Sequence, residues 1–253
     1  MKFTILGSCS GTEAMPGRRH ASVALELGGR LYLFDAGDSC AYTAHLLGID
    51  VTKLEAIFIS HPHIDHVAGL PYLFFLMQKL TRRRGEAFDR PFDIYVSAPE
   101  IVAGARLLLQ YSAQEPLNRL ITHSVFDGVI FDNGELRVTA RHNGHMGETS
   151  QPYHSFSFLI EAEGRKAVYS GDVKDISELD GWLDCDLLMM ETGHHDPIAV
   201  AQYLKSLPVG PKRLLYVHHG RTMLADPAGC EAQARAILGI PTDVAYDGMT
   251  VAL

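Results

Sequence analysis

The chain has 253 residues, of which 47% are hydrophobic and 21% charged, and this composition indicates a folded protein with one large domain over residues 1–253. Its formal net charge of −8 disfavours binding of long nucleic acid, which depends on Lys and Arg side chains that contact phosphates. Four cysteines without a CxxC pair disfavour a disulfide framework and thiolate zinc binding. No apolar run reaches the ~20 residues needed to cross a bilayer, and residues 1–7 are too short for a signal peptide, so we expect a cytoplasmic protein without membrane contact.

Strands and helices alternate along the sequence. Mostly apolar segments of helical length predict helices, and the one near the C-terminus begins at Asp226 with Pro227 in its first turn. Alternation of this kind indicates the α/β class. In chain order, we expect strands at 30–34 and 54–60, a helix at 67–80, a strand at 92–97, a helix at 99–111, strands at 168–170, 187–190 and 213–217, a helix at 226–238, and two short strands around an Asp-Gly turn at 243–253.

One hexapeptide, His-Pro-His-Ile-Asp-His at residues 61–66, holds an unusual density of polar groups. Imidazole and carboxylate are side chains that zinc, manganese and iron accept as ligands. The hexapeptide follows a predicted strand, and Pro62 keeps His61 extended, so we expect a tight loop between a strand and a helix. One such histidine is common in a solvated loop, but this cluster indicates a metal site, as does the total of 13 histidines.

The hexapeptide after a hydrophobic strand resembles the HxHxDH signature of the metallo-β-lactamase fold hydrolases, and the resemblance extends over residues 1–253. It implies a four-layer αβ/βα sandwich, in which two mixed sheets face each other and helices cover the outside. It also implies a centre of two divalent metal ions, with zinc favoured over manganese or iron. The ligands that it implies are His61, His63 and His145 for one ion, Asp65, His66 and His218 for the other, and Asp172 as the bridge.

Two of the motifs outside the hexapeptide lie before and after it. Asp35 follows a strand and corresponds to an acid that supports the metal loop. The other motif is a lone histidine, for which His145 is preferred because it comes seven residues after Val138, the register of the related sequences. His142 is the first alternative, and His154 is expected to border the pocket.

The last two motifs each follow a strand. Asp172 comes after Gly171, where glycine lets the backbone turn sharply. His218 ends the strand 213–217, with His219 as the alternative ligand.

The N-terminal segment narrows the resemblance to the ribonuclease Z-like branch. Residues 5–22 hold a strand, a glycine turn, a proline, an arginine and a serine in the order found there. Backbone N–H groups, the hydroxyls of Ser8 and Thr12, and Arg18 or Arg19 would bind phosphate oxygens. The alternative is a glycine-rich hairpin with solvated arginines, and the turn alone does not decide between them.

The chain also departs from tRNA-processing ribonuclease Z. Residues 190–193 are Met-Glu-Thr-Gly where those enzymes carry His-Glu-Ala-Thr, and the sequence has no long Gly/Pro-rich insertion to serve as a tRNA-binding arm. One basic patch would either steer a phosphate-bearing substrate or complement a helix end, and the second interpretation is preferred. It consists of Lys79, Arg82, Arg83, Arg84 and Arg90. A small phosphodiester suits the chain better than tRNA, with an RNA 3′ end kept as an option.

The expected reaction is hydrolysis of a small anionic phosphodiester by a hydroxide held between the two metal ions. Asp65 would take up the proton of the nucleophile. His194 would protonate the leaving alkoxide, with His195 or His219 as alternatives. Glu191 would orient the imidazole of His194 or serve only as a structural acid.

Other functions would use the same centre differently. A lactone or thioester hydrolase would need an apolar acyl pocket, for which Tyr72, Phe74, Phe75 and Tyr153 are candidates, although the two phenylalanines fit the core better. A metal-bound binding or sensor protein without turnover is disfavoured, because structural metal sites are usually closed and four-coordinate. A di-iron oxidoreductase is disfavoured because its hexapeptide carries Glu at the second histidine. The apolar helix 67–80 would contribute to a homodimer interface or to the core.

Overall fold

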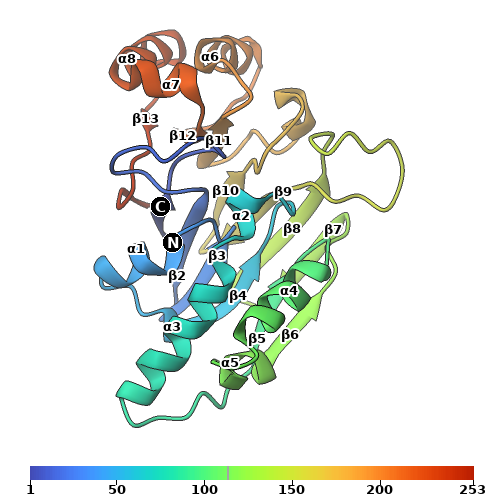
Figure 1. Cartoon of the computed structure of the whole chain (residues 1–253). Coiled ribbons are helices and arrows are strands. Elements are labelled where there is room, and N and C mark those ends of the chain that lie inside the picture. The colour runs from blue at the N-terminus through green and yellow to red at the C-terminus, as the bar shows by residue number, and fades with distance from the viewer. Residues whose placement is uncertain (113) are drawn as a thin grey trace.

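The protein, in a computed structural model that describes residues 1–112 and 114–253, consists of two β-sheets packed face to face with helices outside (Figure 1). The strands are β1 (Lys2–Gly7), β2 (Ser22–Leu27), β3 (Arg30–Phe34), β4 (Leu54–Phe58), β5 (Phe92–Tyr95), β6 (Leu120–His123), β7 (Gly128–Asp132), β8 (Leu136–His142), β9 (Phe156–Ala162), β10 (Arg165–Tyr169), β11 (Leu187–Thr192), β12 (Leu214–His219), β13 (Thr242–Val244) and β14 (Thr250–Ala252). The first sheet has the order β14-β1-β2-β3-β4-β5-β6, and the second has the order β13-β12-β11-β10-β9-β8-β7.

The helices cover the outer faces of the two sheets. They are α1 (Cys40–Leu46), α2 (Ile64–Val67), α3 (Leu70–Arg83), α4 (Glu100–Leu109), α5 (Gln114–Arg119), α6 (Pro197–Ser206), α7 (Arg221–Ala225) and α8 (Pro227–Leu238), with the 3₁₀ helices η1 (Val51–Lys53) and η2 (Ile176–Leu179). Helices α1, α3, α4 and α5 pack on the first sheet, and α6, α7 and α8 pack on the second. No helix in the described part of the chain is long and apolar enough to cross a membrane.

Alternation along the strands divides the apolar side chains between separate cores. In β10, Ala167 and Tyr169 face the space between the sheets, whereas Val168 faces the helices outside. Because the central strands are buried on both faces, they appear in the sequence as continuous apolar runs. The predicted four-layer α/β sandwich is therefore confirmed.

The parallel part of each sheet fixes where functional loops gather. Strands β3 to β6 are mutually parallel in the first sheet, and β10 to β13 are mutually parallel in the second. The carboxyl ends of parallel strands lie at one edge of a sheet, which is the usual position of ligand sites in α/β proteins. The loops after β4 and β10 both leave such an edge.

The predicted helix 67–80 is confirmed over residues 70–80 as part of α3, but its start is not, because α2 ends at Val67 and α3 begins at Leu70. The break is caused by Gly69, whose N–H donates to the Ala36 carbonyl at 2.8 Å. A Cβ atom on Gly69 would lie 2.2 Å from the Gly37 carbonyl oxygen, so a side chain would not fit there. The predicted helices 99–111 and 226–238 are confirmed as α4 and α8, to within two residues at their ends.

The two strands predicted in residues 243–253 exist, but they do not pair with each other. β13 pairs in parallel with β12, and β14 pairs antiparallel with β1, so the Asp-Gly turn carries the chain from one sheet to the other. Gly248 in this turn has a φ of 91° and donates its N–H to the Ile5 carbonyl at 2.8 Å. The two predicted strands are therefore confirmed, and the structure adds that they belong to different sheets.

Candidate metal centre

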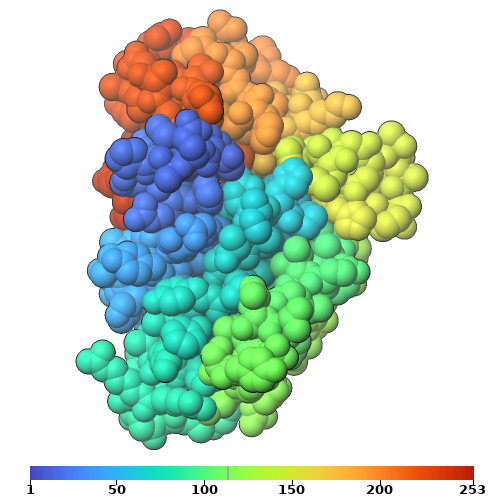
Figure 2. All heavy atoms as spheres, in the orientation of Figure 1, coloured from blue at the N-terminus to red at the C-terminus, as the bar shows by residue number. Residues whose placement is uncertain are grey.

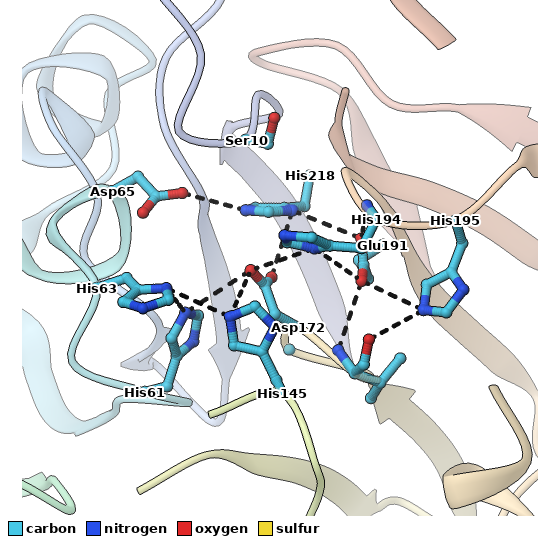
Figure 3. Close-up of polar contacts among 12 residues, drawn as sticks. Ser10, His61, His63, Asp65, His145, Asp172, Glu191, His194, His195 and His218 are labelled. Carbon is cyan, nitrogen blue, oxygen red and sulfur yellow. Dashed lines mark hydrogen bonds and ion pairs between the residues drawn. The ribbon is translucent and has the colours of Figure 1, made fainter. Parts of the chain in front are cut away.

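Loops that follow strands of both sheets bring polar side chains together at one site (Figure 3). Residues 61–66 follow β4, and Asp172 follows β10. His145 lies on the loop after β8, and His218 lies in β12, where its φ is 48°. On the face shown in Figure 2, the dark-blue N-terminal segment meets the cyan segment near residue 65 on one side and orange segments of the C-terminal half of the chain on the other. The site is thus assembled between the two sheets.

Asp172 lies between two groups of histidines and turns one carboxylate oxygen toward each. Its Oδ2 lies 3.7 Å from His61 Nε2 and 3.7 Å from His145 Nε2. Its Oδ1 lies 3.5 Å from His66 Nε2 and 3.3 Å from His218 Nδ1. Among the described residues, Asp172 Oδ1 and His218 Nδ1 are buried without a hydrogen-bond partner. A carboxylate placed in this way fits a bridge between two cations.

The remaining candidate ligands fall into the two groups that the sequence predicted. The structure brings together His61, His63, His145 and Asp172 as one group and Asp65, His66 and His218 as the other. Their ring nitrogens face one another at 2.9 Å (His61 Nε2 to His63 Nδ1) and 3.1 Å (His66 Nε2 to His218 Nε2). Two ligands of a tetrahedral zinc ion with Zn–N bonds of about 2.0–2.1 Å lie roughly 3.3 Å apart. The donor types and their spacing therefore fit divalent metal ions.

The electrostatics of the cluster favour carboxylates that stay ionised. Burial and the neighbouring His66 lower the pKa of His61 to about 2, so its imidazole is neutral and able to bind a metal. Burial opposes the ionised form of Asp172, but His218 and His66 outweigh it and hold the pKa of this carboxyl well below its usual range. Burial likewise opposes the charge on His218, yet Asp172 and Asp65 raise its pKa to about 9. The carboxylate of Asp172 thus stays ionised in a buried site, where its negative charge requires a compensating positive charge.

Asp35 supports the hexapeptide from beneath, as predicted, and is fully buried. Its Oδ1 accepts from the Ser60 backbone N–H at 2.7 Å, and its Oδ2 accepts from Ser60 Oγ at 2.8 Å and Tyr169 Oη at 2.7 Å. Oδ2 also lies 2.7 Å from His66 Nδ1, which orients Nε2 of that ring toward the centre. Sequence reasoning missed Ser60 and Tyr169, although both stand within three residues of a motif.

Glu178 in η2 links the loops that carry His145 and Asp172. Its Oε1 accepts from the Gly144 N–H at 2.7 Å, and its Oε2 accepts from the N–H groups of Lys174 at 3.0 Å and Asp175 at 3.2 Å. No sequence motif marked Glu178, but the pattern Asp175-x-x-Glu178 is a capping-box signature that could have located it.

Three other histidines considered as ligands lie outside the groups formed by the described residues. His142 Nδ1 contacts Asp127 at 2.7 Å, and His154 Nδ1 contacts Glu148. His219 is buried, with Nε2 2.9 Å from the Ala245 carbonyl, and burial lowers its pKa to about 3. In each of these histidines at least one ring nitrogen is therefore engaged away from the ligand groups.

His194 lies over the gap between the two ligand groups. Its ring meets His145 edge-on at 4.8 Å and lies nearly parallel to His218 at 5.8 Å. Nδ1 lies 3.1 Å from Glu191 Oε1, and the hydrogen bond to this carboxylate raises the pKa of His194. The side chain is 47% exposed, so Nε2 remains available. His195 contacts the same acid, with Nε2 3.5 Å from Glu191 Oε1, and the same nitrogen lies 3.0 Å from the Val173 carbonyl.

Glu191 was expected either to orient His194 or to serve only as a structural acid, and its contacts fit both. It is fully buried, and it accepts from the His194 backbone N–H at 2.9 Å. It also lies 3.8 Å from His218 Nδ1 and belongs to a further group that could hold a metal ion, with Asp172, His194 and His218. The acid is thus structurally satisfied and orients His194 as well.

The glycine-rich turn contributes less to the site than predicted. Ser8 is fully buried, its Oγ donates to Asp247 at 2.7 Å, and it accepts from Arg18 at 2.9 Å. These two side chains therefore serve the packing of the turn and do not face the ligand groups. The part of the turn that borders the centre is Gly11, where a Cβ atom would lie 3.0 Å from Asp65 Oδ2.

Thr12 and Arg19 lie on the outer side of the same turn. Thr12 donates to the Glu13 carbonyl at 3.0 Å, and Arg19 donates to the Arg18 carbonyl at 3.1 Å. Arg18 and Arg19 line a cavity of about 360 Å³ with Tyr42 of α1. The structure does not bring Thr12 or Arg19 into contact with the ligand groups.

The basic patch occupies the end of α3 that is remote from the hexapeptide, about 20 Å along a 14-residue helix. Arg82 pairs with Glu115 at 2.6 Å, and Arg84 pairs with Asp50 at 3.0 Å. Arg90 donates to two backbone carbonyls at 2.6 Å. The interpretation as a paired helix end is thus the one that the contacts favour.

The residues proposed for an acyl pocket are dispersed. Phe74 is fully buried under α3, and Phe75 packs against the same core. Tyr72 is 46% exposed on α3, whereas Tyr153 stacks on His142. They do not form one apolar pocket beside the centre.

The fold and the convergence of these ligands define a metallo-β-lactamase-type protein. The family model described as "Beta-lactamase superfamily domain" matches residues 30–219, and the chain belongs to this superfamily.

Within the superfamily, the chain is similar to proteins named ribonuclease Z. It is 37% identical over 139 residues to the one from Treponema denticola, covering 53% of this chain and 41% of that protein. It is 30% identical over 145 residues to the one from Methanothermobacter thermautotrophicus, covering 57% and 45%. A ribonuclease Z from Treponema pallidum is 44% identical over 78 residues, 31% of this chain and 25% of that protein. The matches thus span a quarter to about half the length of these relatives.

Solved structures agree in fold over the whole chain. The metallo-β-lactamase fold protein YhfI from Bacillus subtilis superposes with a TM-score of 0.74 at 19% identity, covering 99% of both chains. The short form of human tRNase Z superposes with a TM-score of 0.71 at 20% identity, covering 100% of this chain and 99% of that one. At these identities the likeness establishes the fold.

Proposed function

We propose that this protein is a dinuclear metal-dependent phosphodiesterase that hydrolyses a small phosphodiester or the 3′ end of an RNA. The observation that carries the proposal is the placement of Asp172, whose two oxygens face separate groups of imidazoles. Similarity to ribonuclease Z supports the reaction class.

The residues present fit two divalent ions, and we propose zinc. His61, His63 and His145 would hold one ion, Asp65, His66 and His218 would hold the other, and Asp172 would bridge them. When bound, such a pair lowers the pKa of a coordinated water and neutralises the non-bridging oxygens of a phosphodiester. The buried Oδ1 of Asp172 supports this role, because an ionised oxygen that accepts no hydrogen bond is costly to bury.

The side chains around the centre would then handle the protons. Asp65 lies 3.2 Å from His218 Nε2 and 3.4 Å from His66 Nε2, and its carboxylate would accept the proton of the attacking water. His194 would donate a proton to the leaving alkoxide from Nε2, since Glu191 engages Nδ1. The exposed position of His194 leaves room for a leaving group beside it.

The substrate is proposed to be small and anionic. The net charge of −8 opposes tight binding of a long polyanion. The basic patch at the end of α3 is remote from the centre, and its Arg82 and Arg84 are paired with acids, so it does not extend the centre into a nucleic-acid surface. We retain a cytoplasmic location and a homodimer as parts of the proposal.

The first test compares hydrolysis of bis(p-nitrophenyl) phosphate with hydrolysis of a chromogenic lactone. Zinc-loaded and manganese-loaded wild-type protein would be assayed beside Asp172→Ala, which removes the bridge. We expect turnover of the diester by the wild type and loss of turnover and of full metal content in the variant. Turnover of the lactone alone, or full activity of Asp172→Ala, would contradict the proposal.

A further inference from the structure

His142, the last residue of β8, forms an aromatic stack near the metal centre. Its imidazole lies parallel to the phenol ring of Tyr153, with centroids 3.9 Å apart and an interplanar angle of 5°. Asp127 accepts from the His142 backbone N–H at 2.7 Å and contacts Nδ1 at 2.7 Å. The ring is thus fixed by the stack and by two contacts to one carboxylate, while 39% of the side chain stays exposed.

The alternation of β8 sets the direction of this ring. Leu136, Val138 and Ala140 belong to the core between the two sheets, so His142 extends the same row to the rim where that core ends. Tyr153 packs against the same core. The phenol therefore supports the imidazole from the protein side.

The stack lies within reach of the metal ligands. His142 pairs with Phe156 of β9, and the Phe156 N–H donates to the carbonyl of Ser60 at 2.9 Å, one residue before His61. Residues paired across antiparallel strands lie about 5 Å apart, so two such steps place the backbone of His142 about 10 Å from that of Ser60, the residue before His61. The loop between β8 and β9 projects from the molecule in Figure 1. It begins directly after His142 and contains both the candidate ligand His145 and Tyr153.

We propose that His142, backed by Tyr153, is a stacking subsite for a nucleobase whose phosphate lies at the metal centre. This inference rests on the proposed function and narrows its substrate class to nucleotide-containing diesters. A fixed, half-exposed ring offers the flat π surface on which any base stacks, and such stacking is tolerant of base identity. The Nδ1–H of His142 donates to Asp127, so Nε2 is free to accept a hydrogen bond at the edge of the ring.

Two substitutions separate stacking from a structural role. His142→Phe keeps a planar ring and loses the contact to Asp127, whereas His142→Asn keeps a polar N–H near Asp127 and loses the ring. Each variant, in zinc-loaded form, would be titrated calorimetrically with uridine 5′-monophosphate and with ribose 5-phosphate, which lacks the base. Tyr111→Ala, which removes a 93% exposed aromatic ring just beyond α4 in the outer helix layer, serves as the control.

We expect the wild type, His142→Phe and Tyr111→Ala to bind uridine 5′-monophosphate about tenfold or more tightly than ribose 5-phosphate, because a stacked base contributes that much. In His142→Asn the ratio should fall to about one. Equal affinity of the wild type for both compounds, no measurable affinity for the nucleotide, or a ratio kept by His142→Asn and lost by His142→Phe would overturn the inference. Because these are binding measurements, a preference for the nucleotide without diester turnover would refute the proposed reaction and leave the subsite standing.

Discussion

At the scale of single residues, the centre depends on which atom of each side chain is already engaged. Asp35 occupies Nδ1 of His66, and Glu191 occupies Nδ1 of His194, so each ring presents Nε2. His142 and His219 have the same chemistry but are engaged by Asp127 and by a backbone carbonyl. The partner fixes which ring nitrogen is free, and a histidine is a candidate ligand only where that nitrogen reaches the other ligand atoms, as Nε2 of His66 does and the ring of His142 does not.

His194 provides a prediction that depends on the leaving group. His194→Ala should reduce kcat about 10²–10⁴-fold for a diester with an alkoxide leaving group, because that group needs a proton as it departs. The same variant should change kcat little for bis(p-nitrophenyl) phosphate, whose phenolate is stable without a proton. Steady-state kinetics with both substrates would measure this, and the metal content should stay that of the wild type. Equal losses for both leaving groups, or loss of metal, would exclude the role as an acid.

The sequence identified the candidate ligands and missed most of their supports. Motifs such as His-x-His-x-Asp-His reveal ligands because few other uses require that density of imidazoles. Ser60 and Glu178 are ordinary residue types, and only the folded backbone places them against Asp35 and Gly144. The contact of Ser8 with Asp247 could not be predicted for the same reason, since the two residues are 239 positions apart.

At the scale of elements, η2 connects two ligand loops through Glu178. We expect Glu178→Ala to weaken metal affinity about 10–100-fold, the usual cost of losing a group that supports metal ligands. Asp226→Ala is a matched control, because Asp226 caps α8 by accepting from the Gly229 N–H at 2.9 Å, away from the centre. It should cost about 0.5–2 kcal/mol of stability and leave metal affinity unchanged. Competition with a chromogenic chelator would compare the two, and equal metal affinities would refute the role of Glu178.

The turn after β10 gives a second prediction at this scale. Gly171 has a φ of 55°, and a Cβ atom there would lie 2.8 Å from the Phe156 carbonyl oxygen and 2.9 Å from Ser60 Cβ. Gly164 has a φ of 70°, but a Cβ atom at this position would meet nothing within 4 Å. Gly164→Ala should therefore destabilise the protein by about 1–2 kcal/mol through backbone strain alone. Gly171→Ala should cost about 1–3 kcal/mol more through crowding, as measured by urea denaturation, and equal costs would contradict this account.

The pairing of the last two strands and the start of α3 were not predicted, and both for the same reason. An Asp-Gly turn between short apolar runs is a strong local signal for a hairpin, but it carries no information about which sheet each strand joins. Likewise, the apolar run 67–80 gave no sign that the backbone of Gly69 lies against Gly37, which ends α2 before α3 begins. The order of the layers was predictable because buried parallel strands appear as continuous apolar runs. The pairing of edge strands leaves no such pattern and was not predictable.

At the scale of the whole molecule, the centre joins the two sheets. The hexapeptide and Asp35 belong to the first sheet, whereas Asp172 and His218 belong to the second. Bound metal should therefore stabilise the entire fold and not one loop. At a free-metal concentration 100-fold above Kd, the gain is about 2.7 kcal/mol, which corresponds to about 5–10 °C in Tm for a chain of this size.

Calorimetry before and after chelation would measure this stabilisation. The zinc-loaded protein should unfold in one transition at the higher temperature, and the chelated protein should unfold about 5–10 °C lower. Asp172→Ala should resemble the chelated protein whether or not zinc is added. A Tm that does not respond to chelation would contradict the assignment of a centre shared by both sheets.

The position of Asp172 between the sheets also bears on how fast the protein unfolds. Its partners His61 and His66 lie far away in the sequence, so the full ligand set exists only after the two halves of the chain have docked. Interactions that form after the transition state of folding slow unfolding without accelerating folding. Metal supply would then act on the lifetime of the folded chain, and a cell short of zinc would lose the protein to proteolysis as well as lose its activity.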